Sequence, residues 1–142
     1  GRIAEAIIAI PGASNYFKGS IVSYTNEIKE RLLNVDHDIM EEKTAVCEEV
    51  AIAMVKGAID TLNVDYAISA TGFAGPSSDS PLVPVGTIWL ACGSKDDVVT
   101  LKLEEDNGRD LNLANATSQA LKLFLEYITQ RLPIEETELN TK

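Results

Sequence analysis

An apolar segment at residues 64–70 runs directly into a loop that contains two glycines, an alanine and a proline. The loop reads Thr71-Gly72-Phe73-Ala74-Gly75-Pro76. Glycine and alanine let the main chain come close to a ligand, and proline stiffens the exit. Loops at the carboxyl end of a buried strand are where open α/β sheets bind small molecules. The sequence therefore predicts an α/β fold with a ligand loop at 72–76, although a plain strand-to-loop turn has the same pattern.

The composition predicts one domain and argues against several classes of partner. A chain of 142 residues that is 45% hydrophobic can form a single core. The formal net charge is −10, and no cluster of lysine and arginine offers a surface for nucleic acid. We find neither an apolar run that could cross a bilayer nor a signal peptide. We therefore expect a cytoplasmic domain over 1–132 and a solvated acidic tail over 133–142.

The two cysteines and the single histidine do not predict a metal site. Cys47, Cys92 and His37 are too few for the usual four-ligand zinc site. We expect both cysteines to be reduced and structural, which suits a cytoplasmic setting. We expect His37, between two aspartates, to lie in an exposed loop.

Two long helices are predicted. The clearer one spans 48–62, with acidic residues in its first turn, where the helix dipole favours negative charge. A last helix spans 110–132 and is ended by Pro133. The residues of that helix expected to face inward are Leu113, Ala114, Thr117, Ala120, Leu121, Phe124, Leu125 and Ile128.

Shorter elements complete the expected fold. Strands are predicted at 18–24, 64–70, 84–92 and 98–103, and the last two are joined by a hairpin turn. Short helices are predicted at 2–10, after a cap at Asn26, and from Asp36 to Met40. Because helices separate the strands, we expect a three-layer α/β/α sandwich with a mixed sheet.

Three groups of residues could carry chemistry. The spacing of Tyr24, Asn26 and Lys29 lets the lysine amine fold back beside the tyrosine hydroxyl, and a partly desolvated lysine can act as a general base. A surface lysine beside a packed tyrosine is the alternative. The main-chain N–H groups of the 72–76 loop could hold an oxyanion or a phosphate. Arg109, at the start of the last helix, could bind an anion, or it could be an exposed residue beside a simple helix cap. If strands 18–24 and 64–70 run parallel, Lys29 and the loop share one edge of the sheet.

The order of several motifs resembles the CinA C-terminal domain family, whose members include bacterial nicotinamide mononucleotide (NMN) amidohydrolases. The resemblance covers about residues 1–132. Its motifs are, in order, Pro11-Gly12-Ala13-Ser14, Tyr16-Phe17, Gly19, Val22-Ser23-Tyr24-Thr25-Asn26, Lys29, Leu33-Asn34-Val35, 44–50, Gly72 with Ala74-Gly75-Pro76, and Pro84-Val85-Gly86-Thr87.

The resemblance implies hydrolysis of the NMN carboxamide to nicotinate mononucleotide and ammonia, without metal or cofactor. It implies that a serine attacks the amide, that Lys29 is the base or proton shuttle, and that Tyr24 is its hydrogen-bonding partner. Asn26 would order that turn, and Arg109 would contact the phosphate. The implied lining of the nucleotide pocket is Gly72, Ala74, Gly75, Pro76 and Thr87. The family often self-associates, so a homo-oligomer is also expected.

The sequence departs from the family pattern at the nucleophile. The serine belongs to an E-S-C-T-G-G motif that would end at Gly1, so we expect this chain to be inactive by that route and to leave a sheet edge exposed. Cys47 stands where serine is usual, Leu113 replaces a second basic residue, and 77–80 replaces a more glycine-rich loop. Two alternatives are a non-catalytic nucleotide-binding or interaction domain and an oligomerisation module.

Overall fold

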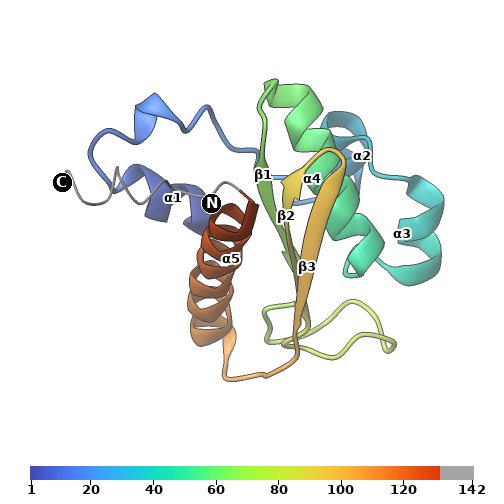
Figure 1. The fold of residues 1–142 in the computed structure, drawn as a ribbon. Coiled ribbons are helices and arrows are strands. Elements are labelled where there is room, and N and C mark those ends of the chain that lie inside the picture. Colours follow the sequence, from blue (N-terminus) through green and yellow to red (C-terminus); the bar gives the residue numbers. More distant parts are fainter. Residues whose placement is uncertain (132–142) are drawn as a thin grey trace.

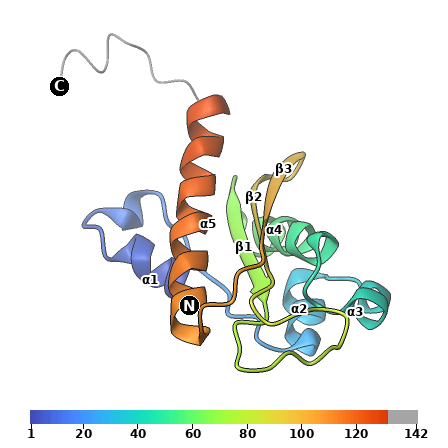
Figure 2. The same ribbon diagram turned by 90° about the horizontal axis from the view of Figure 1, so that it is seen from below.

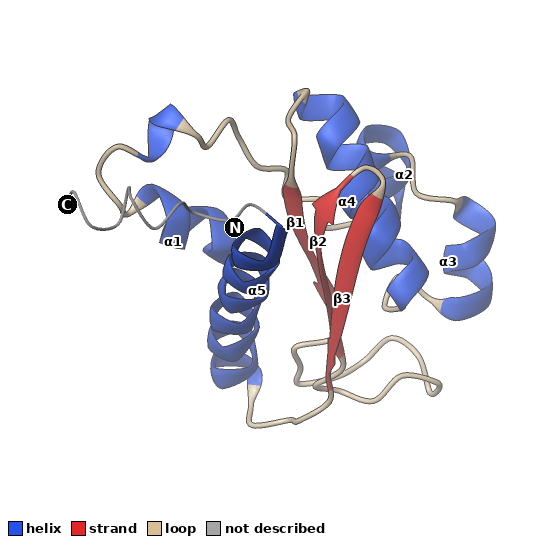
Figure 3. Ribbon diagram, in the orientation of Figure 1, coloured by secondary structure: helices blue, strands red, loops and turns tan. Residues whose placement is uncertain are grey.

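A three-stranded sheet lies between two layers of helices (Figures 1 and 3). The structure, a computed structural model, describes residues 1–131. Strands β1 (Ala67–Gly72), β2 (Ile88–Ser94) and β3 (Asp97–Leu103) lie in the order β1-β2-β3, and both pairings are antiparallel. The α/β class is confirmed, but the described sheet is antiparallel rather than mixed. Pro133 and the expected acidic tail lie outside the described residues.

The helices cover both faces of the sheet. Helix α4 (Glu48–Leu62) packs on one face and α5 (Arg109–Arg131) on the other. Outside α4 lie α2 (Asn26–Leu33) and α3 (His37–Lys43). Outside α5 lie α1 (Arg2–Ile8) and the short 3-10 helix η1, at 13–15 (Figure 2). Within residues 1–131 no helix combines the length and apolar character that a membrane span requires.

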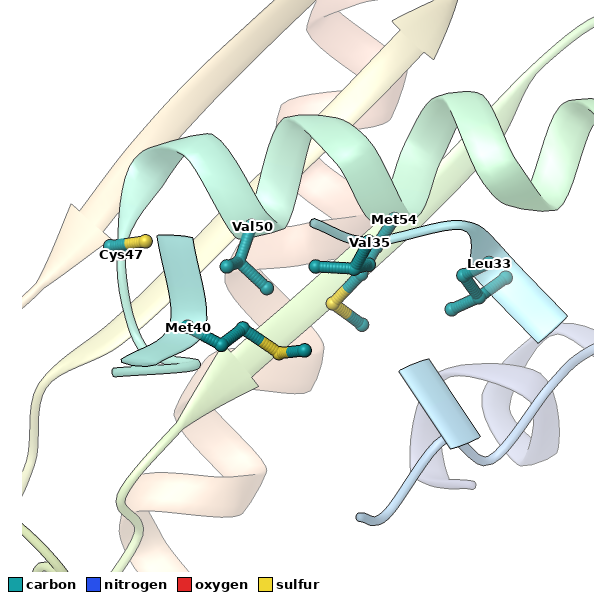
Figure 4. Packing of buried hydrophobic residues seen from close by; sticks show 6 residues of the cluster. All are labelled: Leu33, Val35, Met40, Cys47, Val50 and Met54. Carbon is teal, nitrogen blue, oxygen red and sulfur yellow. The ribbon is translucent and has the colours of Figure 1, made fainter. Parts of the chain in front are cut away.

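Helix α4 spans the residues that its sequence predicts and organises two parts of the core. One face packs on α2 and α3 through a cluster of buried residues, here called the first cluster (Figure 4). Another face packs on the sheet. Val50 and Val55 are fully buried, one on each side. The first cluster comprises Leu33, Val35, Met40, Cys47, Val50 and Met54. Because the helix is apolar around much of its circumference, it forms the centre of the fold.

Helix α5 forms as predicted, but its buried face only partly matches the expected one. Its buried residues are Asn112, Ala116, Ala120 and Tyr127, of which Ala120 is buried as predicted and the other three are not expected there. Of the expected inward residues, Ala114 is exposed and 65% of the Leu125 surface is exposed. The helix turns Ala116 and Ala120 toward Ile88 and Leu90 of β2. Small side chains let a helix approach a sheet closely. The sequence pattern does not identify this face, because leucines lie all around α5 and its apolar residues therefore form no single stripe.

The strand predicted at 18–24 is not formed. The segment carries no ladder, and no backbone hydrogen bond joins it to β1 within residues 1–131. Ile21 packs against the first cluster, while Val22 is 63% exposed. Alternation alone cannot make a strand, because the backbone groups of a strand need a neighbouring strand.

His37 is exposed as expected, but it begins α3 rather than lying in a loop. Its Nδ1 lies 2.5 Å from Oε1 of Glu30 on α2, and its Nε2 lies 3.7 Å from Oε1 of Glu41. The hydrogen bond to Glu30 raises the pKa of His37 above 6.5. A group whose pKa is higher in the folded state than in the unfolded state stabilises the fold when it is protonated. This stabilisation is complete below the unfolded-state pKa and is lost as pH rises through the folded-state pKa.

We therefore expect the free energy of unfolding to fall slightly as pH rises above 6.5 through the folded-state pKa of His37. His37→Gln should remove this part of the pH dependence. Urea unfolding at a series of pH values, on both proteins, measures it. The prediction is wrong if the two pH profiles have the same slope.

Candidate functional site

The loop after β1 is anchored to the strand that follows it. Phe73 N donates to the carbonyl of Thr87 at 3.0 Å, and Gly86 N donates to the carbonyl of Phe73 at 2.8 Å. Thr87 is 5% exposed, so it lies beneath the loop rather than on its surface. Gly75 has a φ of 107°, a backbone conformation that residues other than glycine rarely adopt. The Gly75–Pro76 peptide bond is cis.

The start of α5 holds this loop through two consecutive carbonyl groups. Arg109 Nη1 donates to the carbonyl of Gly75 at 2.6 Å, and Asn112 Nδ2 donates to the carbonyl of Ala74 at 2.9 Å. The 72–76 loop and Arg109, two separate candidates in the sequence, are therefore in contact. Arg109 has one N–H committed to the loop, and its other guanidinium N–H groups have no acceptor among residues 1–131.

Sequence reasoning missed Asn112, which is only 4% exposed. An asparagine in the first turns of a helix usually suggests capping or a solvent-facing position. Its spacing of four and eight residues from Ala116 and Ala120 places it on the buried face. That spacing would have identified the residue only if the orientation of α5 had been predicted correctly.

Two main-chain donors of the loop have no acceptor in the part of the chain that the structure describes. Neither Ala74 N–H nor Gly75 N–H meets an acceptor within the described chain, although both residues are buried. Buried N–H groups are nearly always paired in native proteins. Two neighbouring unpaired N–H groups are suited to an anionic oxygen.

Lys29 is buried in the first turn of α2, with 7% of its surface exposed. Its Nζ donates to the carbonyl of Ser23 at 2.7 Å, and burial lowers the pKa of its amine below 10.5. The amine therefore folds back as its spacing suggested. Tyr24 does not accompany it, because this side chain is 80% exposed. Asn26 is the first helical residue, and the cap is Thr25, whose Oγ1 accepts from Ile28 N at 3.3 Å.

Lys29 makes no hydrogen bond to the 72–76 loop within residues 1–131. Its helix, α2, packs on α3 and α4. Two surface cavities, of about 140 and 330 Å³, are lined by neither Lys29 nor a residue of 72–76. The smaller one adjoins Thr87, and the larger one lies beside α1. Strand β1 is an edge strand of the described sheet, with a strand neighbour on one side only.

The two cysteines are buried, free thiols. Burial raises the pKa of Cys47 and raises that of Cys92 to about 11. A thiol with a raised pKa is largely protonated near neutral pH and is a poor nucleophile. Both residues are therefore structural, as their sequence context predicted.

Comparisons with known proteins agree with the resemblance. The chain is 38% identical over 131 residues to a CinA-like protein of Petrotoga mobilis, which covers 92% of this chain and 32% of that protein. It is 37% identical over 130 residues to the nicotinamide-nucleotide amidohydrolase PncC of Pseudomonas putida, covering 92% of this chain and 81% of PncC. The chain thus spans about a third or less of the first CinA-like relatives it matches.

Solved structures show the same fold. A CinA superfamily protein of Escherichia coli superposes with a TM-score of 0.86 at 30% identity, covering 89% of this chain and 74% of that one. Competence damage-inducible protein A of Klebsiella pneumoniae gives 0.88 at 24% identity, covering 92% and 81%. The family model described as the CinA C-terminal domain matches residues 1–128. From α1 to nearly the end of α5, the chain therefore belongs to the CinA C-terminal domain family.

Proposed function

We propose that the chain is the domain of an amidohydrolase that converts NMN to nicotinate mononucleotide and ammonia. The observation that carries the proposal is Lys29, whose amine is buried, has a lowered pKa and forms no ion pair with a carboxylate among residues 1–131. Burial makes such an amine easier to deprotonate than an exposed lysine, so it is better suited to act as a base. The similarity to PncC along 92% of the chain favours an amide as the substrate.

In the proposed reaction, a serine supplied from upstream of Gly1 attacks the carboxamide carbon, and Lys29 takes the serine proton. The carbonyl oxygen becomes an oxyanion, held by main-chain N–H donors. Collapse of this intermediate breaks the C–N bond, and the proton from Lys29 leaves with ammonia. Water then attacks the acyl-enzyme with Lys29 as base, which releases the carboxylate product and restores the serine.

In this proposal, the segment that carries the serine pairs with the free edge of β1. Antiparallel or parallel pairing of an added strand on that edge would satisfy its open backbone groups. It would also set a residue at the strand end beside the 72–76 loop. Arg109 would face the phosphate with the N–H groups that the loop does not use.

The test is ammonia release from NMN by the natural protein with its upstream residues, beside the 142-residue chain. We expect release by the longer protein only. Release by the short chain would contradict the serine assignment. Release by neither, together with NMN binding by calorimetry, would favour a non-catalytic nucleotide-binding domain.

A further inference from the structure

The side-chain amide of Asn112 is committed on both of its ends. Its Nδ2 donates to the carbonyl of Ala74 and to Oδ1 of Asp106, each at 2.9 Å. Its Oδ1 accepts from Asn107 N at 2.8 Å. Asp106 Oδ1 also accepts from Gly108 N at 3.1 Å. Because both amide hydrogens and the amide oxygen are used, Asn112 cannot rotate without breaking buried hydrogen bonds.

The contact with Ala74 determines where the next N–H points. In a planar trans peptide, the C=O of one residue and the N–H of the next point in opposite directions. The Ala74 carbonyl points to Asn112, so the N–H of Gly75 points away from α5. This N–H is one of the two loop donors without an acceptor among residues 1–131. Asn112 therefore sets the direction of the Gly75 N–H, to which it is not itself hydrogen-bonded.

We infer that Asn112 is a positioning residue, which orients the Ala74–Gly75 peptide so that Gly75 N–H can bind an anionic oxygen of the ligand. A merely structural residue would need only to fill space. An apolar side chain of the same shape would fill that space, but it would leave the Ala74 carbonyl without a donor and the peptide free to turn. The orientation of the Ala74–Gly75 peptide follows from the hydrogen bonds of Asn112 alone. The identity of the ligand rests on the proposed function.

Asn112→Leu keeps the shape of the side chain and its charge of zero, so it isolates the hydrogen bonds. Asp106→Ala removes the exposed carboxylate that holds Asn112, and it separates two explanations. If charge alone matters, losing an anion strengthens binding of an anionic ligand, whereas loss of positioning weakens it. Asn115→Ala, at an exposed position of α5, is the matched control.

The experiment is an NMN titration of the isotope-labelled 142-residue chain by NMR, followed at the Gly75 amide, with the order parameter of that amide as a second readout. We expect Asn112→Leu to lower the order parameter and to weaken NMN binding about tenfold, the value of one hydrogen bond to a buried group. Asp106→Ala should change both in the same direction by less. Asn115→Ala should change neither.

Binding and order parameter within about twofold of the parent in Asn112→Leu would overturn the inference. Tighter NMN binding by Asp106→Ala would overturn it too, and that exposed variant serves if Asn112→Leu does not fold. A lowered order parameter, with no NMN shift even in the parent chain, would support the positioning role and contradict the proposed substrate.

Discussion

Gly57→Ala should destabilise the protein by about 2 kcal/mol or more, a large fraction of the 5–15 kcal/mol typical of a folded domain. Gly57 lies where α4 crosses the end of α2. An added Cβ would overlap the carbonyl oxygen of Leu33 and lie 2.6 Å from its carbonyl carbon. The obstacle is backbone, so the two helices must separate. The better helix propensity of alanine offsets only about 1 kcal/mol.

Urea unfolding monitored by circular dichroism measures this loss, and Gly19→Ala is its control. The Cβ added there would lie 3.6 Å from Leu62 Cδ2, which is an ordinary contact. We expect Gly19→Ala to unfold near the parent midpoint. An unchanged or higher midpoint for Gly57→Ala would mean that α2 and α4 do not pack this closely.

Lys29→Met in the natural, longer protein should lower kcat/KM for NMN by about 100- to 10,000-fold, the range that one general base supplies. The pH profile gives a second signature. The base must be deprotonated, so the parent activity should fall as pH drops through the lowered pKa of Lys29. The variant should lack this dependence. Ammonia release from neutral to alkaline pH measures both effects.

Lys56→Met is the matched control, because Lys56 is exposed on α4. It should leave the rate and the pH profile unchanged. Circular dichroism must show that Lys29→Met is folded, since the change also leaves the Ser23 carbonyl without its donor. A folded Lys29→Met protein with parent activity would make Lys29 a structural residue.

The sequence predicts an element well where several local signals agree. For α4, the apolar stripe and the acidic first turn point to the same limits, and the structure has them at 48–62. The hairpin of β2 and β3 follows equally from short-range chemistry, and its register pairs Ser94 with Asp97. Such features depend on neighbours along the chain, which the sequence displays directly.

The site was only partly predictable because it depends on distant parts of the chain. The spacing around Lys29 correctly predicts that its amine folds back. It wrongly places Tyr24 beside that amine, because the strand expected at 18–24 does not form and the tyrosine is exposed. The contact between Arg109 and Gly75 joins residues 34 positions apart. Asn112 became recognisable only when the packing of α5 on the sheet was known. Its burial and its hydrogen bonds are set by tertiary structure rather than by a local motif.

The two ends of α5 are fixed to different parts of the sheet. Near its carboxyl end, the Tyr127 hydroxyl donates to the carbonyl of Asp97 at 2.8 Å and accepts from Ser94 N at 3.2 Å, at the tip of the β2–β3 hairpin. Near its start, Asn112 holds the loop. Fifteen residues of helix separate these anchors, a length of about 22 Å. Turning the helix about its axis would break both sets of bonds, so α5 acts as a strut that ties the geometry of the loop to that of the hairpin.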